Sequence, residues 1–245
     1  SMTDFYVTDA GLGITETTIA GFVGYDVNGM PEFIRARKAT QYANNIDQWV
    51  KLVNEGNNGG YANIWLLCNI NTCEIARYEQ GLKNQELLES TDGFYYGCSA
   101  CHNPRIRNLE CVDNGYNDTR QQTGARRARF EQLLPEVSGT IDDSVAKKIL
   151  ADKYDPYLGY QCASSRNICA HYDVDPQYYA DDPHGVWNVP FFPGGSCDGK
   201  CADATDIENL NMWGIFGRAD GEPFDAKDFM KQHPEWNWQK GYLYD

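Results

Sequence analysis

The fold prediction starts from one stretch in which a helix ends, the chain turns and an apolar strand begins: Glu55-Gly56-Asn57-Asn58-Gly59-Gly60-Tyr61-Ala62-Asn63-Ile64-Trp65-Leu66-Leu67. Gly56 occupies a helix C-cap position, and the asparagines and glycines after it tolerate positive φ at little steric cost. Asn63 stands where the strand begins, so a sheet would hold its side-chain amide at a defined position. The stretch therefore predicts a turn that delivers a hydrogen-bond donor to the end of a strand.

Helical and extended patterns flank this stretch. Helices are predicted at residues 31–42, with Pro31 in the first turn, and at 46–54, with Asn45 as the N-cap and apolar residues on one face. Strands are predicted at residues 12–19, after a shorter extended run, and at 64–68, 74–78 and 93–97. These alternating segments predict a strand-rich first half with two helices inserted in it.

The second half of the chain is less regular. Helices are predicted at residues 125–134, from a capped start at 140–143 through 151, and at 225–231, and strands near 199–205 and 209–216. No linker or charge run divides the 245 residues. We therefore expect an α+β fold with layered helices and sheet, in a single domain over residues 1–245.

Charge and hydropathy exclude two classes of partner. The chain has 21 Lys and Arg against 35 Asp and Glu, which gives a formal net charge of −14. Such a charge disfavours nucleic acid and anionic membrane surfaces. No apolar run approaches the roughly 20 residues that span a bilayer, and residues 1–4 lack the basic and apolar parts of a signal peptide. We expect no nucleic-acid partner and no transmembrane segment.

Nine cysteines are the clearest sign of cellular location. Eight fall in close pairs, which leaves Cys111 over: Cys68 and Cys73, Cys98 and Cys101, Cys162 and Cys169, Cys197 and Cys201. Paired cysteines are typical of disulfides in exported proteins. Asn117 begins a glycosylation sequon, which supports export weakly because such triplets are common. We expect four disulfides and an extracytoplasmic protein.

Residues 98–102, Cys-Ser-Ala-Cys-His, also fit the pattern of covalent haem attachment. The strand-rich surroundings and the many other cysteines favour a disulfide or free thiols instead. A zinc site would need a second Cys or His pair at suitable spacing, and none follows. We expect no metal and no cofactor.

Several ordered segments give the chain a family resemblance. They are residues 11–19, 35–39, 57–67, 125–129, 169–171 and 233–240. In this order they resemble the carboxyl-terminal part of an N-terminal-nucleophile hydrolase, closest to the acyl-coenzyme A:6-aminopenicillanate acyltransferase-like hydrolases and the phospholipase B-like proteins. The resemblance implies an αββα sandwich and hydrolysis or acyl transfer at carbon-nitrogen bonds of linear amides or at lipid esters, in a secreted or lysosomal protein.

The nucleophile is the main departure from the family pattern. In the family it is usually a Cys at the amino terminus of the processed catalytic chain, and the strands that carry it precede the segment resembling residues 11–19. The resemblance therefore implies that another chain of the same precursor supplies the nucleophile, or that this chain is an inactive piece. Ser1 is a further candidate, because Ser serves in this superfamily, but its position does not fit the family order.

The resemblance assigns roles to particular residues. Asn63 matches the oxyanion-hole Asn, and Arg126 falls where choloylglycine hydrolases keep an active-site Arg. The structural alternatives are a loop-capping amide and a solvated arginine face. Apart from the resemblance, Trp187, Phe191, Phe192 and His171 are candidates for a substrate pocket, and the alternatives are core or rim packing of the aromatic residues and a structural histidine. The leading hypothesis is an acyl-amide or acyl-ester hydrolase, and the alternative is a non-catalytic, disulfide-containing exported binding or structural domain.

Overall fold

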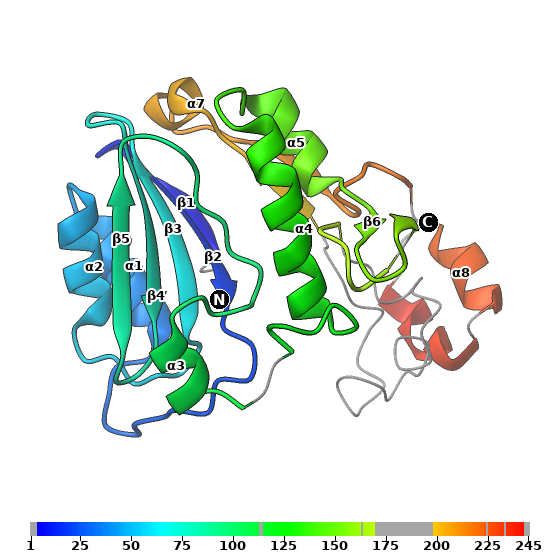
Figure 1. The fold of residues 1–245 in the computed structure, drawn as a ribbon, viewed down its shortest axis with the longest axis horizontal. Helices are drawn as coiled ribbons and strands as arrows, with labels where there is room; N and C mark the ends of the chain where they lie inside the picture. Colours follow the sequence, from blue (N-terminus) through cyan, green and yellow to red (C-terminus); the bar gives the residue numbers. More distant parts are fainter. Residues whose placement is uncertain are drawn as a thin grey trace.

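The computed structural model describes residues 4–112, 115–162, 164–169, 198–223, 225–232 and 234–242. Its main feature is a five-stranded antiparallel sheet in the order β1-β2-β3-β4-β5 (Figure 1). The strands are β1 (Phe5–Val7), β2 (Leu12–Thr18), β3 (Asn63–Asn69), β4 (Glu74–Gln80) and β5 (Gln85–Ser90). Together with the helices, this sheet confirms a mixed, α+β type of fold.

Two helices cover one face of the sheet, α1 (Glu32–Tyr42) and α2 (Ile46–Asn54). Asn45 caps α2, because its side chain accepts a hydrogen bond from the Gln48 N–H at 2.9 Å. The core between helices and sheet contains Trp49 and Trp65, whose ring centroids lie 4.9 Å apart in an edge-to-face arrangement. Both predicted helices are confirmed, and their apolar faces pack against the sheet.

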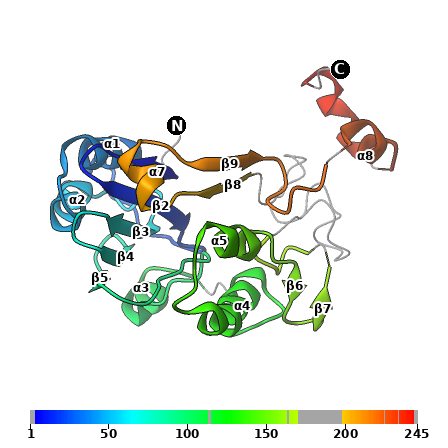
Figure 2. The same cartoon turned by 90° about the horizontal axis from the view of Figure 1, so that it is seen from above.

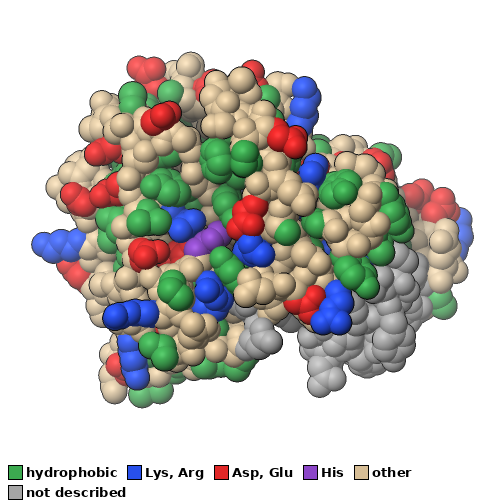
Figure 3. Space-filling view, in the orientation of Figure 1, with side chains coloured by type: hydrophobic (Ala, Val, Ile, Leu, Met, Phe, Trp, Pro, Cys, Tyr) green, Lys and Arg blue, Asp and Glu red, His purple; other side chains and the backbone are tan. Residues whose placement is uncertain are grey.

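The opposite face of the sheet is only partly covered. One row across the strands contains Thr15, Leu66, Arg77 and Leu88; Thr15 is exposed and Leu88 keeps 38% of its surface accessible. Residues 97–103 and α3 (Pro104–Leu109) lie over one end of this face (Figure 2). In the space-filling view, apolar and charged side chains of both signs mix on the surface (Figure 3). The sheet thus has one helix-covered face and one partly open face.

The remaining elements stand beside the sheet. They are α4 (Gln122–Val137), α5 (Asp143–Leu150), the hairpins β6 (Tyr154–Asp155) with β7 (Tyr160–Gln161) and β8 (Asp198–Cys201) with β9 (Trp213–Phe216), α7 (Ala204–Glu208), α8 (Ala226–Gln232) and the 3₁₀ helix η1 (Pro234–Tyr242). Asp142 caps α5, as predicted, by accepting a hydrogen bond from the Val145 N–H at 2.8 Å. No helix in the described part of the chain is long and apolar enough to cross a membrane.

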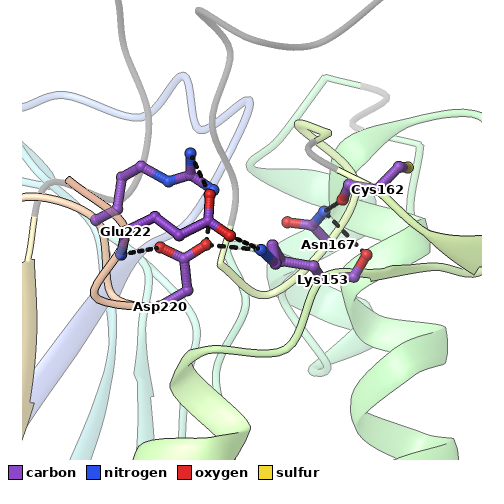
Figure 4. A network of polar contacts seen from close by, with 6 residues as sticks. Lys153, Cys162, Asn167, Asp220 and Glu222 are labelled. Atoms are coloured by element: carbon purple, nitrogen blue, oxygen red, sulfur yellow. Dashed lines mark hydrogen bonds and ion pairs between the residues drawn. The ribbon is translucent and has the colours of Figure 1, made fainter. Parts of the chain in front are cut away.

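A polar network ties the β6 region to the segment after β9 (Figure 4). Lys153 Nζ lies 3.0 Å from Asp220 Oδ2 and 2.6 Å from Glu222 Oε1. On the other side of Lys153, Asn167 Nδ2 donates to the Lys153 carbonyl at 3.3 Å and to the Cys162 carbonyl at 2.6 Å. These contacts join segments that are far apart in the sequence.

Three of the predicted strands differ from the structure. Residues 93–97 form a loop, and the last strand of the sheet is instead Gln85–Ser90, which pairs with β4. Strand β5 lies at the sheet edge and carries charged side chains, so its pattern is weakly apolar. The predicted strands near 199–205 and 209–216 are shorter, because Asp203 caps the helix α7 between them.

Candidate functional site

Asn63 begins β3, opposite Thr18 of β2 and Gln80 of β4. Its side chain is completely buried on the same sheet face as Trp65, because alternate strand residues share a face. In the amide orientation that satisfies the neighbouring polar groups, Nδ2 donates to Glu16 Oε2 at 2.8 Å and to the Ala62 carbonyl at 3.2 Å. Both amide hydrogens of Asn63 are therefore engaged.

Glu16 is the residue that the sequence analysis missed at this position. Tyr61 Oη donates to Glu16 Oε1 at 3.0 Å, and Tyr61 itself holds a left-handed φ of 57°. Burial is the main cause that raises the pKa of Glu16 to about 8, and the neighbouring Asp4 and Glu32 carboxylates raise it further, against the Tyr61 hydrogen bond. Glu16 is thus largely protonated at pH 7, and no local sequence pattern marks it.

The turn before Asn63 has the role that its composition predicts. Asn57 Nδ2 donates to the Gly81 carbonyl at 2.7 Å, and the Asn57 and Asn58 side chains accept hydrogen bonds from the N–H groups two residues later, both at 2.9 Å. Gly59 has φ +73°, and a Cβ there would lie 2.7 Å from the Gly24 carbonyl oxygen. These contacts fix the path by which the chain enters β3.

A second buried polar group lies next to Asn63, on its cross-strand neighbour Gln80. Gln80 Oε1 lies 3.3 Å from Trp65 Nε1 and 3.3 Å from a guanidinium nitrogen of Arg35. Arg35 also donates to the carbonyls of Met30, at 2.9 Å, and Val53. The sequence indicates that Arg35 is buried, because it shares a helix face with Ala36 and Ala39. Its contacts to carbonyl oxygens indicate a structural role.

Arg126 lies in the first turns of α4, away from Asn63. Its Nε and one terminal nitrogen donate to the Ser165 carbonyl at 3.2 and 2.9 Å, and the latter nitrogen also donates to Gln122 Oε1 at 2.9 Å. Its charge acts on the buried thiol of Cys98, whose pKa burial nevertheless raises to about 11. Cys98 belongs to the segment over the open sheet face. The described structure therefore places Asn63 and the surroundings of Arg126 on opposite faces of the sheet.

The segment with the Cys-Ser-Ala-Cys-His pattern encloses a buried carboxylate. Cys101 Sγ donates to Glu79 Oε2 at 3.1 Å, and the N–H groups of His102 and Asn103 donate to the same carboxylate at 3.1 and 2.6 Å. Burial and the Glu79 charge raise the pKa of the Cys101 thiol far above its usual range. Cys101 is therefore a protonated, hydrogen-bonded thiol and a poor nucleophile, which gives the pattern a structural role.

The expected disulfides are not formed in the structure. Cys73, Cys98, Cys101 and Cys169 are thiols, so none of the pairs Cys68–Cys73, Cys98–Cys101 and Cys162–Cys169 is bridged. Cys201 is a thiol that donates to Asp143 Oδ1 at 3.1 Å, and Cys197 lies outside the described residues. The disulfides and the export they imply stay predictions.

One acidic group of the described residues has ligand atoms close enough for a metal ion: Asp143, Asp203 and Asp206, within 4.8 Å of one another. All three have other partners. Asp203 and Asp206 form the capping box of α7, and Asp143 bonds Lys147 at 3.0 Å. Helix capping accounts for Asp203 and Asp206, and contacts with Lys147 and Cys201 account for Asp143, so the cluster is not proposed as a metal site.

The remaining expected site residues lie elsewhere. Trp187, Phe191, Phe192 and His171 fall outside the described residues. Asn117 is exposed and lines a cavity of about 1080 Å³ together with Arg107, Tyr116 and Gln122. No family model matches the chain, and no curated protein matches it either.

Proposed function

We propose that this chain is one portion of an N-terminal-nucleophile hydrolase that acts on a linear amide or a lipid ester. The observation that carries the proposal is the half-covered sheet, with α1 and α2 on one face and exposed Thr15 and Leu88 on the other. A second sheet on the open face would complete an αββα sandwich. The proposed partner is a nucleophile-bearing chain from the same precursor.

In the proposed reaction, a Cys at the amino terminus of the partner chain attacks the substrate carbonyl, with its own α-amine as base. The amine passes the thiol proton to the departing amine or alcohol as the amide or ester bond breaks, and water then hydrolyses the thioester to a carboxylic acid and the free thiol. Asn63 is the proposed oxyanion donor, and no step is assigned to Arg126, because its surroundings lie on the opposite face of the sheet. For this role Asn63 Nδ2 exchanges one of its two present partners for the oxyanion.

The second candidate function is a non-catalytic, exported binding or structural domain on the same fold. Two observations favour it: both Asn63 amide hydrogens are engaged, and the Arg126 guanidinium is bound to the Ser165 carbonyl. Intact-mass analysis of the natively purified protein, combined with hydrolysis assays on amide and lipid-ester probes, separates the two. A second polypeptide that starts with Cys, Ser or Thr, together with hydrolysis, supports the enzyme, whereas a lone 27.7 kDa chain without hydrolysis refutes it.

The role of Asn63 has its own test. Asn63→Ala is expected to lower kcat by about 10²–10³ with little change in KM, because an oxyanion donor acts mainly in the transition state. Asn44→Ala, at an exposed asparagine before α2, is the control and keeps wild-type kinetics. An Asn63→Ala enzyme with unchanged kcat contradicts the assignment.

A further inference from the structure

Arginines from three elements surround His102 on the partly open side of the sheet. Arg77 comes from β4, Arg107 from α3 and Arg127 from α4. Burial, followed by the charges of Arg77, Arg127 and Arg107, lowers the pKa of His102 to about 4. The imidazole is therefore neutral at pH 7, and three guanidinium groups lie within electrostatic range of one side chain.

This cluster carries excess positive charge in an acidic chain. Arg77 Nε lies 3.4 Å from Glu79 Oε1, and a terminal nitrogen of Arg127 lies 2.6 Å from Glu131 Oε2. Arg107 instead donates to the carbonyls of Cys101 and His102, at 2.8 and 2.9 Å, and pairs with no carboxylate in the described part. Three arginines thus face two carboxylates, and a bound anion would offset the repulsion among the arginines.

Hydrogen-bonding capacity is also unused here. His102 Nε2 and Arg77 Nε are buried and have no hydrogen-bond partner among the described residues, since the Arg77–Glu79 contact lacks hydrogen-bond geometry. Unsatisfied buried polar atoms are uncommon and costly. The Arg77 side chain is only 13% exposed, so bulk water compensates it little. Two unsatisfied groups within one cationic cluster indicate a site for a polar ligand.

Aromatic rings hold the cations in place. The guanidinium carbons of Arg107 and Arg127 lie 3.9 and 4.7 Å from the centroid of the Tyr116 ring. The Tyr96 ring meets His102 edge-on, with centroids 4.9 Å apart. Positions fixed in this way reduce the entropy that a ligand must overcome.

One edge of the cluster, at Arg107 and Tyr116, opens into a cavity. This is the cavity of about 1080 Å³ described above. The side chains of His102, Arg107 and Tyr116 are each only partly buried.

We propose that Arg77, Arg107, Arg127 and His102 form a binding site for a phosphate group. Guanidinium groups match phosphate oxygens in geometry and charge. A phosphate dianion exceeds the single excess charge of the cluster, and a proton taken up from solvent at His102 Nε2 balances it. The protonated Nε2 then donates to a phosphate oxygen. A carboxylate, with one negative charge, requires no such proton.

Proton uptake depends on the charged and titratable groups around His102, which are Arg77 and Glu79 of β4, Tyr96, Cys98 and Cys101 of residues 97–103, Arg107 of α3, Tyr116, and Arg127 and Glu131 of α4. The two carboxylates favour the imidazolium and the three arginines oppose it. A bound phosphate dianion, like the two carboxylates, favours the imidazolium. Phosphate binding is therefore expected to raise the pKa of His102.

The test uses the whole chain and inorganic phosphate at neutral pH, in about 0.1 M NaCl to screen weak surface binding. Calorimetry is expected to show saturable binding, and NMR to show the His102 ring signals move toward the imidazolium position. Arg107→Gln is expected to weaken binding by about tenfold or more, because it removes a charged hydrogen-bond donor. Arg105→Gln, at an exposed arginine of the same helix, is the matched control and binds as the wild type does.

Three results would overturn the proposal: no saturable phosphate binding to the folded wild type, equal weakening by both substitutions, or acetate binding as tightly as phosphate without moving the His102 signals. If Arg107→Gln does not fold, the wild-type NMR titrations with phosphate and acetate decide alone. The test requires no enzymatic activity, so failure of the proposed hydrolase function leaves it unaffected.

Discussion

Glu16→Gln tests the buried cluster at the start of β3. Glu16 accepts hydrogen bonds from Asn63 and Tyr61, and its folded-state pKa of about 8 lies far above the ordinary value of 4.5. Because the folded pKa is raised, the folded state binds the extra proton between these values. The contribution of this proton to the free energy of unfolding is fully present below pH 4.5 and is lost as the pH rises through 8. At 1.36 kcal/mol per pKa unit, the loss is at most about 5 kcal/mol.

The introduced glutamine would mimic the protonated carboxyl, since it is neutral and its side-chain oxygen accepts a hydrogen bond from Asn63. We expect Glu16→Gln to be about as stable as the wild type near pH 5 and more stable by up to about 5 kcal/mol near pH 9. Urea unfolding followed by tryptophan fluorescence measures this, because Trp49 and Trp65 lie in the adjoining core.

The difference between variant and wild type is the quantity to follow, because other groups titrate in the same range. His102 acts in the opposite direction: its lowered folded pKa of about 4 means that stability is lost as the pH falls from about 6.5 toward 4. Glu208→Gln, at an exposed glutamate of α7, is the control, since solvent screens its charge. A stability difference that stays constant from about pH 5 to 9 would refute the reasoning.

Three further predictions concern stability and cysteine chemistry. Asn45→Ala is expected to cost about 1 kcal/mol in urea unfolding through loss of the α2 cap, whereas Asn44→Ala costs little; equal costs would contradict the cap. Gly97→Ala is expected to destabilise by about 1–3 kcal/mol, because the added Cβ would lie 2.4 Å from Thr17 Cγ2, and an unchanged midpoint would show that the loop moves freely. Thiol counting under denaturing, non-reducing conditions is expected to find far fewer than nine free thiols in natively exported protein. Detection of all nine as free thiols would contradict the export prediction.

Local sequence patterns were sufficient for the elements around the opening stretch. Asn45 marks the start of α2, Gly56 follows its end with φ +68°, and the asparagine and glycine run forms the turn before β3. These features depend on residues within a few positions of one another, so capping and backbone preferences specify them. Strand β5 was missed because a charged edge strand is specified by pairing with β4 rather than by its own pattern.

The sequence by itself determined the capped starts of α2 and α5, the turn and the β3 core strand of this protein, because short-range hydrogen bonds and periodicity encode them. Only the tertiary structure decided which polar groups meet. The register that pairs Thr18 with Asn63 brings Glu16 beside Asn63, and the loop over the open sheet face brings Cys101 to Glu79 rather than to Cys98. The same packing gathers three arginines around His102. Such contacts join residues distant in sequence, and strand register and layer packing specify them where local pattern does not.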